Sequence, residues 1–169
     1  YELHVHSDTV LDLINYSSIV SYSPVFFDGD FYKNILVKSS DKTGQGLLVL
    51  NTNDKLSKVN HTIFQNLDSL SHRKKFLNIT GAITFYKSPV KITNSKFLKN
   101  YSEDFINIID TQFEIENIYV DESYSDAIDI DFGNGHLSEI EIINSSNDAV
   151  DFSGSNARLH NIKINSAGD

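Results

Sequence analysis

The chain of 169 residues is long enough for one domain with a single buried core, and 40% of its residues are hydrophobic. It has no cysteine, which excludes disulfides and thiolate metal sites, and no apolar run of the ~18–20 residues that span a bilayer. The net charge of −9, with no recognisable nucleic-acid-binding motif, argues against nucleic acid as a partner.

Residues 1–31 are predicted to form an irregular coil or an N-terminal cap. Within them, "ELHVHSD" places His4 and His6 on one side of an extended strand, because side chains alternate along a strand. Such a pair can chelate Zn²⁺, and the stretch resembles the first metal motif of the PHP phosphoesterase family. That family needs further ligands from an α/β barrel, so we expect a surface strand rather than a zinc site.

Residues 32–80 are expected to form long coils with inserted loops. "YKNILVKSS" from Tyr32 and "VNHTIFQN" from Val59 are weak copies of a unit that is clearer downstream. The basic loop His72–Lys75 could hold an anionic sugar or phosphate, although a solvated loop is the favoured interpretation. Residues 33–99 hold 12 of the 14 Lys and Arg, whereas residues 100–157 hold fourteen acids and no Lys or Arg. This predicts a positive and a negative end.

The clearest internal repeat lies in residues 81–169. "SEDFINIID", "YSDAIDIDF", "SNDAVDFSG" and "SAGD" align, and their shared aspartates are spaced by 22, 22 and 21 residues: Asp104, Asp126, Asp148 and Asp169. A second motif recurs as "ITNSKF", "IENIYV", "LSEIEI" and "LHNIKI", with starts 23, 22 and 22 residues apart. Each period therefore holds two short runs.

Both runs alternate apolar and polar residues with a period of two, which is typical of strands and not of helices. The inward positions are expected to stack as columns through successive periods. In the first run these columns are Ile83, Ile106, Ile128, Val150 and Phe85, Ile108, Ile130, Phe152; in the second they are Ile92, Ile115, Leu137, Leu159 and Phe97, Val120, Ile142, Ile164. The same alternation places Phe132 in the interior.

A period of this length without helices favours a solenoid of parallel strands, since the leucine-rich repeat signature is absent. The pattern resembles the right-handed parallel β-helix of the pectin-lyase-like superfamily. Asn94, Asn117 and Asn161 resemble the turn-asparagine ladder of that fold, which Glu139 interrupts. The resemblance implies an all-β fold: a right-handed parallel β-helix with coils of about 22 residues, forming one domain over residues 1–169.

The chain stops at the first residue of another period. We therefore expect a fragment of a bacterial surface or secreted protein, with further coils beyond residue 169. Its expected localisation is extracellular or at the cell surface.

Acidic residues gather on the outward side of the first run. Its outward column reads Thr84, Asn107, Asp129, Asp151, and Asp131 lies two residues along from Asp129 on the same side. Equivalent residues of stacked coils lie ~4.8 Å apart, so Asp129 and Asp151 would share a proton or bind a cation unless the face is simply hydrated. Asp129, Asp131 and Asp151 are the candidate Ca²⁺ ligands.

"SDAIDIDFGNG" does not encode an EF-hand. Counted from Asp129, the loop lacks an Asp or Asn at the fifth position, a glycine at the sixth and a glutamate at the twelfth. The turn column Asp104, Asp126, Asp148, Asp169 is expected to accept backbone N–H groups instead.

The second run carries two outward rows of mixed charge. They are Lys91, Glu114, His136, Arg158 and Lys96, Tyr119, Glu141, Lys163. Opposite charges on neighbouring rungs predict ion-paired ladders, with Glu141 beside Lys163 as the clearest pair.

Two functions of different class remain. The first is a non-catalytic extracellular module that binds polysaccharide or a surface partner, or serves as a rigid spacer. The second is a carbohydrate-active enzyme, a polysaccharide lyase, glycoside hydrolase or epimerase, using Asp129 and Asp151. The polygalacturonase-like members of the superfamily carry an Asn-Thr-Asp, a Gly-His-Gly and an Arg-x-Lys motif, which "YSDAIDID", "GNGHLS" and "ARLHNIK" match incompletely. The non-catalytic module is therefore the favoured expectation, with Ca²⁺ as the one cofactor considered.

Overall fold

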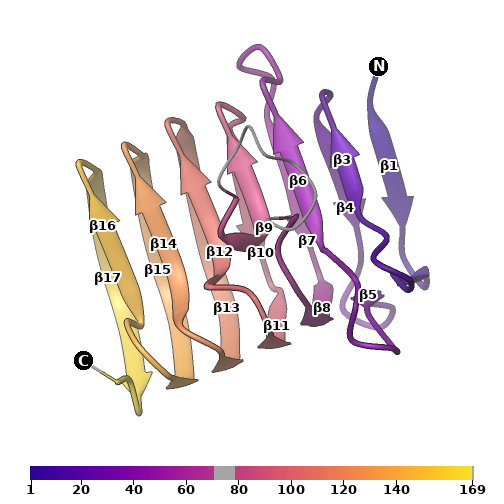
Figure 1. Ribbon diagram of the computed structural model, residues 1–169. Helices are drawn as coiled ribbons and strands as arrows, with labels where there is room; N and C mark the ends of the chain where they lie inside the picture. Colours follow the sequence, from indigo (N-terminus) through magenta and orange to yellow (C-terminus); the bar gives the residue numbers. More distant parts are fainter. Residues whose placement is uncertain (71–78, 169) are drawn as a thin grey trace.

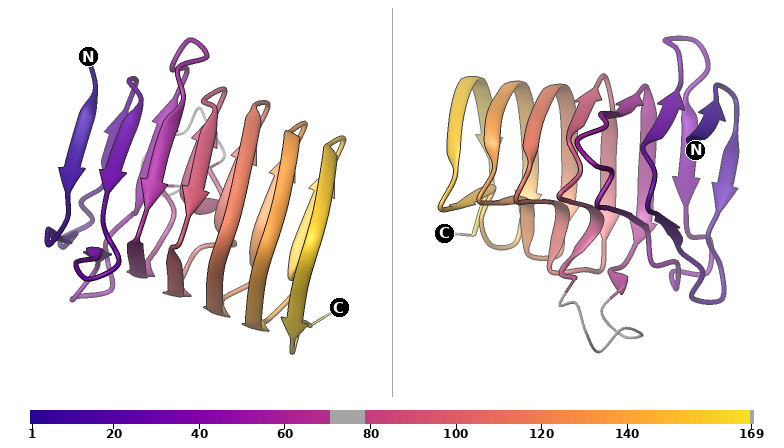
Figure 2. Two further views of the ribbon diagram at one scale, coloured as in Figure 1. Left: turned by 180° about the vertical axis from the view of Figure 1, so that it is seen from behind. Right: turned by 90° about the horizontal axis from the view of Figure 1, so that it is seen from above.

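The computed structural model describes residues 1–70 and 79–168, and these residues form strands joined by turns and loops. The chain winds as an all-parallel β-solenoid of about seven turns with roughly 23 residues per turn (Figure 1). The two further views show the coils stacked along one axis (Figure 2). The predicted parallel β-helix is confirmed. The described residues include no helix with the length and apolarity that crossing a bilayer requires.

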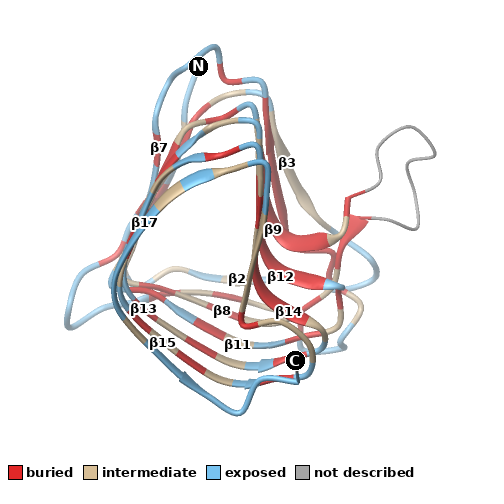
Figure 3. Cartoon of the chain, turned by 90° about the vertical axis from the view of Figure 1, so that its left-hand side faces the viewer, coloured by how far each residue is buried: buried red, intermediate tan, exposed pale blue. Residues whose placement is uncertain are grey.

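Each coil has three faces, and the coils superimpose into one three-sided outline when seen along the axis (Figure 3). The first face is a six-stranded sheet of β3 (Ile19–Ser21), β6 (Leu47–Leu50), β9 (Gly81–Tyr86), β12 (Asp104–Ile109), β14 (Asp126–Asp131) and β16 (Val150–Ser153). It contains the first run of every period.

The other two faces form one eleven-stranded sheet that bends along a corner. The second face consists of β1 (Leu3–His6), β4 (Val25–Asp28), β7 (Ser57–Asn60) and β10 (Val90–Thr93). The third consists of β2 (Val10–Asp12), β5 (Ile35–Lys38), β8 (Thr62–Leu67) and β11 (Lys96–Asn100). In the last coils one long strand covers both faces: β13 (Gln112–Ser123), β15 (Asn134–Ser145) and β17 (Asn156–Asn165).

Residues with positive φ make the corners of the coil. Between the second and third faces the corner column is His61, Asn94, Asn117, Glu139, Asn161, with φ of 44°, 50°, 52°, 53° and 52°. Similar columns close the other two corners, through Lys99, Glu122, Asn144 and through Lys87, Asp110, Phe132. Asparagine tolerates this left-handed conformation better than most residues with a Cβ, which explains the recurrence of Asn94, Asn117, Asn144 and Asn161 at corners.

The predicted inward columns form the core. Ile83, Ile106 and Ile128 are fully buried and lie in register on β9, β12 and β14. The ring of Phe97 stacks on Phe64 of the preceding coil at 5.2 Å between centroids. The columns continue to the last described coil, where Leu159 and Ile164 are half exposed because no further coil covers them in the described residues.

The prediction that Phe132 is buried is wrong. Phe132 has a φ of 53° at a corner, and 67% of its surface is exposed. A left-handed residue reverses the alternation of a strand, so the side chain that would have followed Ile130 inward points to solvent.

A second apolar cluster covers the outer side of the first face near the N-terminus. It joins Leu48 and Leu50 of β6 to Leu70 and Ile79, with Val20 and Tyr86 packed against it. The outer side of this face is therefore apolar at β6 and becomes acidic at β14 and β16.

Candidate functional site

The acidic site lies on the outer side of the first face, on β12, β14 and β16. The strand register places Asn107 beside Asp129, and Asp129 beside Asp151, as predicted. Asp129 and Asp151 are half-buried, while Asn107 is 1% exposed. The column is therefore less hydrated than an open strand face.

Asn107 links two carboxylates. Its Nδ2 donates to Oδ2 of Asp129 at 2.6 Å and to Oδ2 of Asp104 at 3.2 Å. Its Oδ1 is buried without a hydrogen-bond partner among the described residues. Two donors of one amide thus tie together acids that would otherwise repel each other.

Burial is the main cause that raises the pKa of Asp129 to about 7, and the negative charges of Asp104, Asp131 and Asp151 add to it. Burial also raises the pKa of Asp104 to about 6, although a hydrogen bond with Thr80 opposes the shift. The pKa of Asp131 is raised by burial and by Asp151. Asp104 and Asp129 therefore take up protons between about pH 7 and pH 6.

The structure brings one trio of carboxylates to metal-binding distance in its described part. Single oxygens of Asp126, Asp148 and Asp151 lie within 4.8 Å of one another. Of the predicted ligands, this trio includes Asp151, while Asp129 and Asp131 lie beside it on β14. Oδ1 of Asp126 also accepts the backbone N–H of Asp148 at 3.0 Å, as expected for a turn aspartate.

The melting temperature should fall as the pH rises from 5 to 8. The folded pKa values of Asp129 and Asp104, about 7 and about 6, lie above the ordinary value of 3.8, so the folded state binds more protons than the unfolded state. The stability this gives is complete below the ordinary value and is lost as the pH passes through 6 and 7. Thermal unfolding followed by circular dichroism across this range measures the effect.

The Asp129→Asn variant should flatten that profile and should be more stable than the parent at pH 8. Asp54→Asn is the matched control. Asp54 is exposed and has a φ of 59° that asparagine accepts, and its replacement removes one negative charge, as Asp129→Asn does. A profile of the same slope in Asp129→Asn and Asp54→Asn would mean that general charge repulsion, and not this carboxyl, sets the pH dependence.

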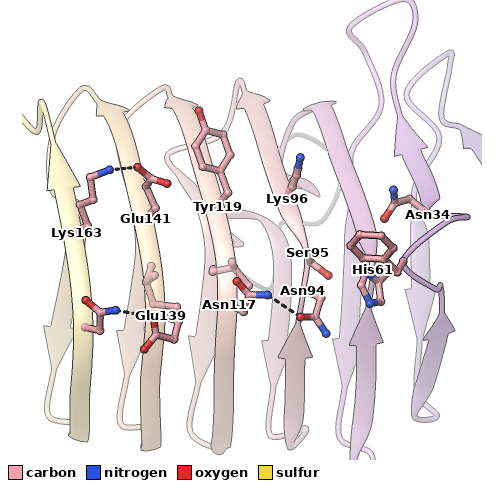
Figure 4. A pocket seen from close by; sticks show the side chains of 14 residues that line it. Asn34, His61, Asn94, Ser95, Lys96, Asn117, Tyr119, Glu139, Glu141 and Lys163 are labelled. Carbon is pink, nitrogen blue, oxygen red and sulfur yellow. Dashed lines mark hydrogen bonds and ion pairs between the residues drawn. The ribbon is translucent and has the colours of Figure 1, made fainter.

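A second candidate site is a shallow groove that runs along the corner between the second and third faces (Figure 4). We call it the amide groove. Its volume is about 530 Å³, within the ~300–1,000 Å³ range of ligand clefts. It crosses successive coils, and its lining includes Phe31, Asn34, His61, Asn94, Lys96, Asn117, Tyr119, Glu139, Glu141, Asn161 and Lys163, above a floor of Ser95, Ile118 and Ile140.

The first row of the amide groove is the corner column. Nδ2 of Asn117 donates to Oδ1 of Asn94 at 2.7 Å, and Nδ2 of Asn94 donates to Oδ1 of Asn60 at 2.9 Å. Asn161 donates in the same way to Glu139. Each amide has two donors and an acceptor with two lone pairs, so an exposed ladder amide still has capacity for a ligand.

The second row lies two residues further along each coil. Lys96, Tyr119, Glu141 and Lys163 are register partners on β11, β13, β15 and β17. Lys163 is ion-paired with Glu141, as predicted. Lys96 has no ion pair among the described residues. The Lys91–Glu114 pair, on the second face, is also confirmed.

Of the remaining predicted features, the His4–His6 pair belongs to neither candidate site. Both ring nitrogens of His4 face carboxylates, Glu2 at 3.0 Å and Asp28 at 3.6 Å, and its ring stacks on Phe26. In the described part of the chain, no metal-ligand group forms around His4 and His6. The basic loop His72–Lys75 and Asp169 lie outside the described residues.

The sequence named the members of both rows but not the groove. The sequence pattern predicts a turn ladder for the first row and ion-paired side chains for the second row. The strand pattern alone does not show that a left-handed corner brings the two rows to opposite sides of one groove. The repeat alignment of the stretch from Val59 also places His61 at the position of the corner asparagines. Phe31 was missed, since the loop that presents it has no counterpart in the later coils. One signal in the sequence could have revealed the groove. Each corner residue from Asn94 onward is followed two positions later by another polar residue, as Asn94 is by Lys96 and Asn117 is by Tyr119.

Comparisons with known proteins found no matching family model, and no match among curated proteins or solved structures.

Proposed function

We propose that this chain is a non-catalytic, extracellular module that binds a polysaccharide along the amide groove. The observation that carries the proposal is the repetition of exposed amide and charged side chains in two rows, once per coil. Rungs of a parallel solenoid recur about every 4.8 Å, so the groove offers equally spaced donors and acceptors. A polymer with many hydroxyl groups, each both donor and acceptor, matches such a surface.

A peptide fits this groove less well. Peptides commonly bind sheets by pairing with a free strand edge. The groove instead crosses strands that are paired on both sides, as β13 is with β11 and β15.

The Asn117→Gly variant should lower the affinity for a bound polysaccharide about fivefold to tenfold, because it removes a central ladder amide. Glycine accepts the φ of 52° at this corner, so the fold should be kept. Affinity gel electrophoresis against immobilised polysaccharides, followed by calorimetry, measures the change.

Asn144→Gly is the matched control. Asn144 has a φ of 56° at another corner, is exposed and hydrogen-bonds Asp121, but does not line the amide groove. Equal losses in both variants, or no loss in Asn117→Gly, would remove the groove as the binding surface. Failure of every tested polysaccharide to bind would favour a rigid spacer or a protein-binding module.

A carbohydrate-active enzyme is the second candidate, and the raised pKa of Asp129 favours it. A protonated Asp129 beside Asp151 would supply a general acid and a general base. Incubation with neutral and acidic glycans, with analysis for shortened or unsaturated products, tests this function. Activity that is lost in Asp151→Asn and kept in Asn117→Gly would replace the non-catalytic proposal.

Calcium is proposed as a ligand of the acidic site. Asp151, with Asp126 and Asp148 or with Asp129 and Asp131, supplies the carboxylate oxygens that Ca²⁺ prefers.

A further inference from the structure

Two large aromatic side chains are held in solvent at the N-terminal end of the amide groove. Phe31 is 77% exposed and Tyr32 is 90% exposed, and their rings meet edge-to-face at 5.2 Å. We call them the aromatic pair. Exposed aromatic rings gain most from a ligand that covers them, because the apolar area is removed from water on binding.

The loop that carries the aromatic pair is fixed before any ligand arrives. Oδ1 of Asp30 accepts the backbone N–H groups of Tyr32 at 2.9 Å and Lys33 at 3.0 Å. Lys33 is ion-paired with Asp8 at 3.2 Å, and a Cβ at Gly29 would come within 2.4 Å of the His61 carbonyl oxygen. A preorganised loop loses little entropy on binding.

The aromatic pair adjoins the groove through Phe31. Phe31 lines it together with Asn34 and His61, and the rings of Phe31 and His61 meet edge-to-face at 6.4 Å. A polymer lying along the amide rows would therefore reach the aromatic pair at one end. The CH-rich face of a sugar ring is the part of a polysaccharide that packs on an aromatic ring.

The charge of the groove argues against an anionic ligand. Lys96 and Lys163 are balanced by Glu139 and Glu141, and the whole protein carries −9. Long-range repulsion from an acidic protein slows the approach of a polyanion, and a groove with no net positive charge does not compensate. Hydroxyl groups, in contrast, carry no charge and can still form hydrogen bonds with the amides and carboxylates of the groove.

We propose that the amide groove takes an extended, uncharged polysaccharide, with one of its sugar rings packed on Phe31 and Tyr32. This inference rests on the proposed function and adds the class of ligand and the place where the chain is anchored.

The test uses the full chain in calorimetry and affinity gels with hydroxyethylcellulose, xylan and galactomannan as neutral probes and polygalacturonate as the anionic probe. A neutral probe should bind, and polygalacturonate should bind at least about tenfold more weakly. The double variant Phe31→Ala/Tyr32→Ala should lose about tenfold or more in affinity for that neutral probe. Phe132→Ala is the matched control, since Phe132 is exposed at a corner outside the groove.

The outcomes separate the two proposals. Loss of affinity in Asn117→Gly without loss in the double variant would overturn the aromatic anchor and leave the groove as the binding site. Equal or tighter binding of polygalacturonate would overturn the uncharged class. If no polysaccharide binds and the double variant instead loses a protein partner, both proposals fail.

Discussion

Phe97→Ala is expected to lower the free energy of unfolding by about 3–5 kcal/mol. Phe97 is fully buried on β11, stacks on Phe64 at 5.2 Å and meets Phe105 edge-to-face at 5.5 Å. Its removal leaves a cavity between two faces of the coil, and the paired strands on both sides prevent the backbone from closing it. Urea denaturation followed by circular dichroism measures the loss.

Phe132→Asn is the control for this prediction. It removes a ring of the same size from an exposed corner and places asparagine at a φ of 53°, which asparagine tolerates better than phenylalanine. Its stability should equal or exceed that of the parent. Similar losses in the two variants would contradict the assignment of Phe97 to the core and Phe132 to the surface.

Calcium is expected to raise the melting temperature by about 5–10 °C when its free concentration exceeds its dissociation constant about a hundredfold. The physical reason is the gathering of carboxylates around Asp151, where a divalent cation offsets their repulsion. The gain should be larger at pH 8 than at pH 5, because protons compete with the cation for Asp129 and its neighbours. Thermal unfolding in calcium and in chelator gives the comparison.

Two variants identify the ligands. Asp151→Asn should abolish the gain, since Asp151 belongs to both candidate sets of ligands. Asp129→Asn should abolish it only if the site is formed with Asp129 and Asp131, and should retain it if Asp126 and Asp148 are the partners. An identical melting curve in calcium and in chelator would contradict the proposal of a cation site on this face.

The amide groove and the acidic site lie on different parts of the coil, as Figure 3 shows for β13 and β15 against β12 and β14. A groove variant such as Asn117→Gly should therefore leave the calcium response unchanged. The proposed binding function and the proposed calcium response would then be independent properties of one solenoid.

The fold could be predicted from the sequence because coils stack residue on residue, so the same positions of each coil must be apolar and face inward. Ile83, Ile106 and Ile128 are aligned in the sequence and are register partners in the structure. The neighbours Asp129 and Asp151, and the ion pair of Glu141 and Lys163, followed from the same period. Residues 1–31 could not be assigned in this way, since their coils have no regular spacing.

The period in the sequence thus determined which residues are neighbours along the axis, because each strand of a solenoid pairs with the next one. Only the tertiary structure decided where the chain turns and what each turn exposes. The left-handed corners direct Phe132 outward and bring Asn117 and Tyr119 to opposite sides of one groove. Burial, which depends on the packing of separate segments, raises the pKa of Asp104 to about 6 and that of Asp129 to about 7.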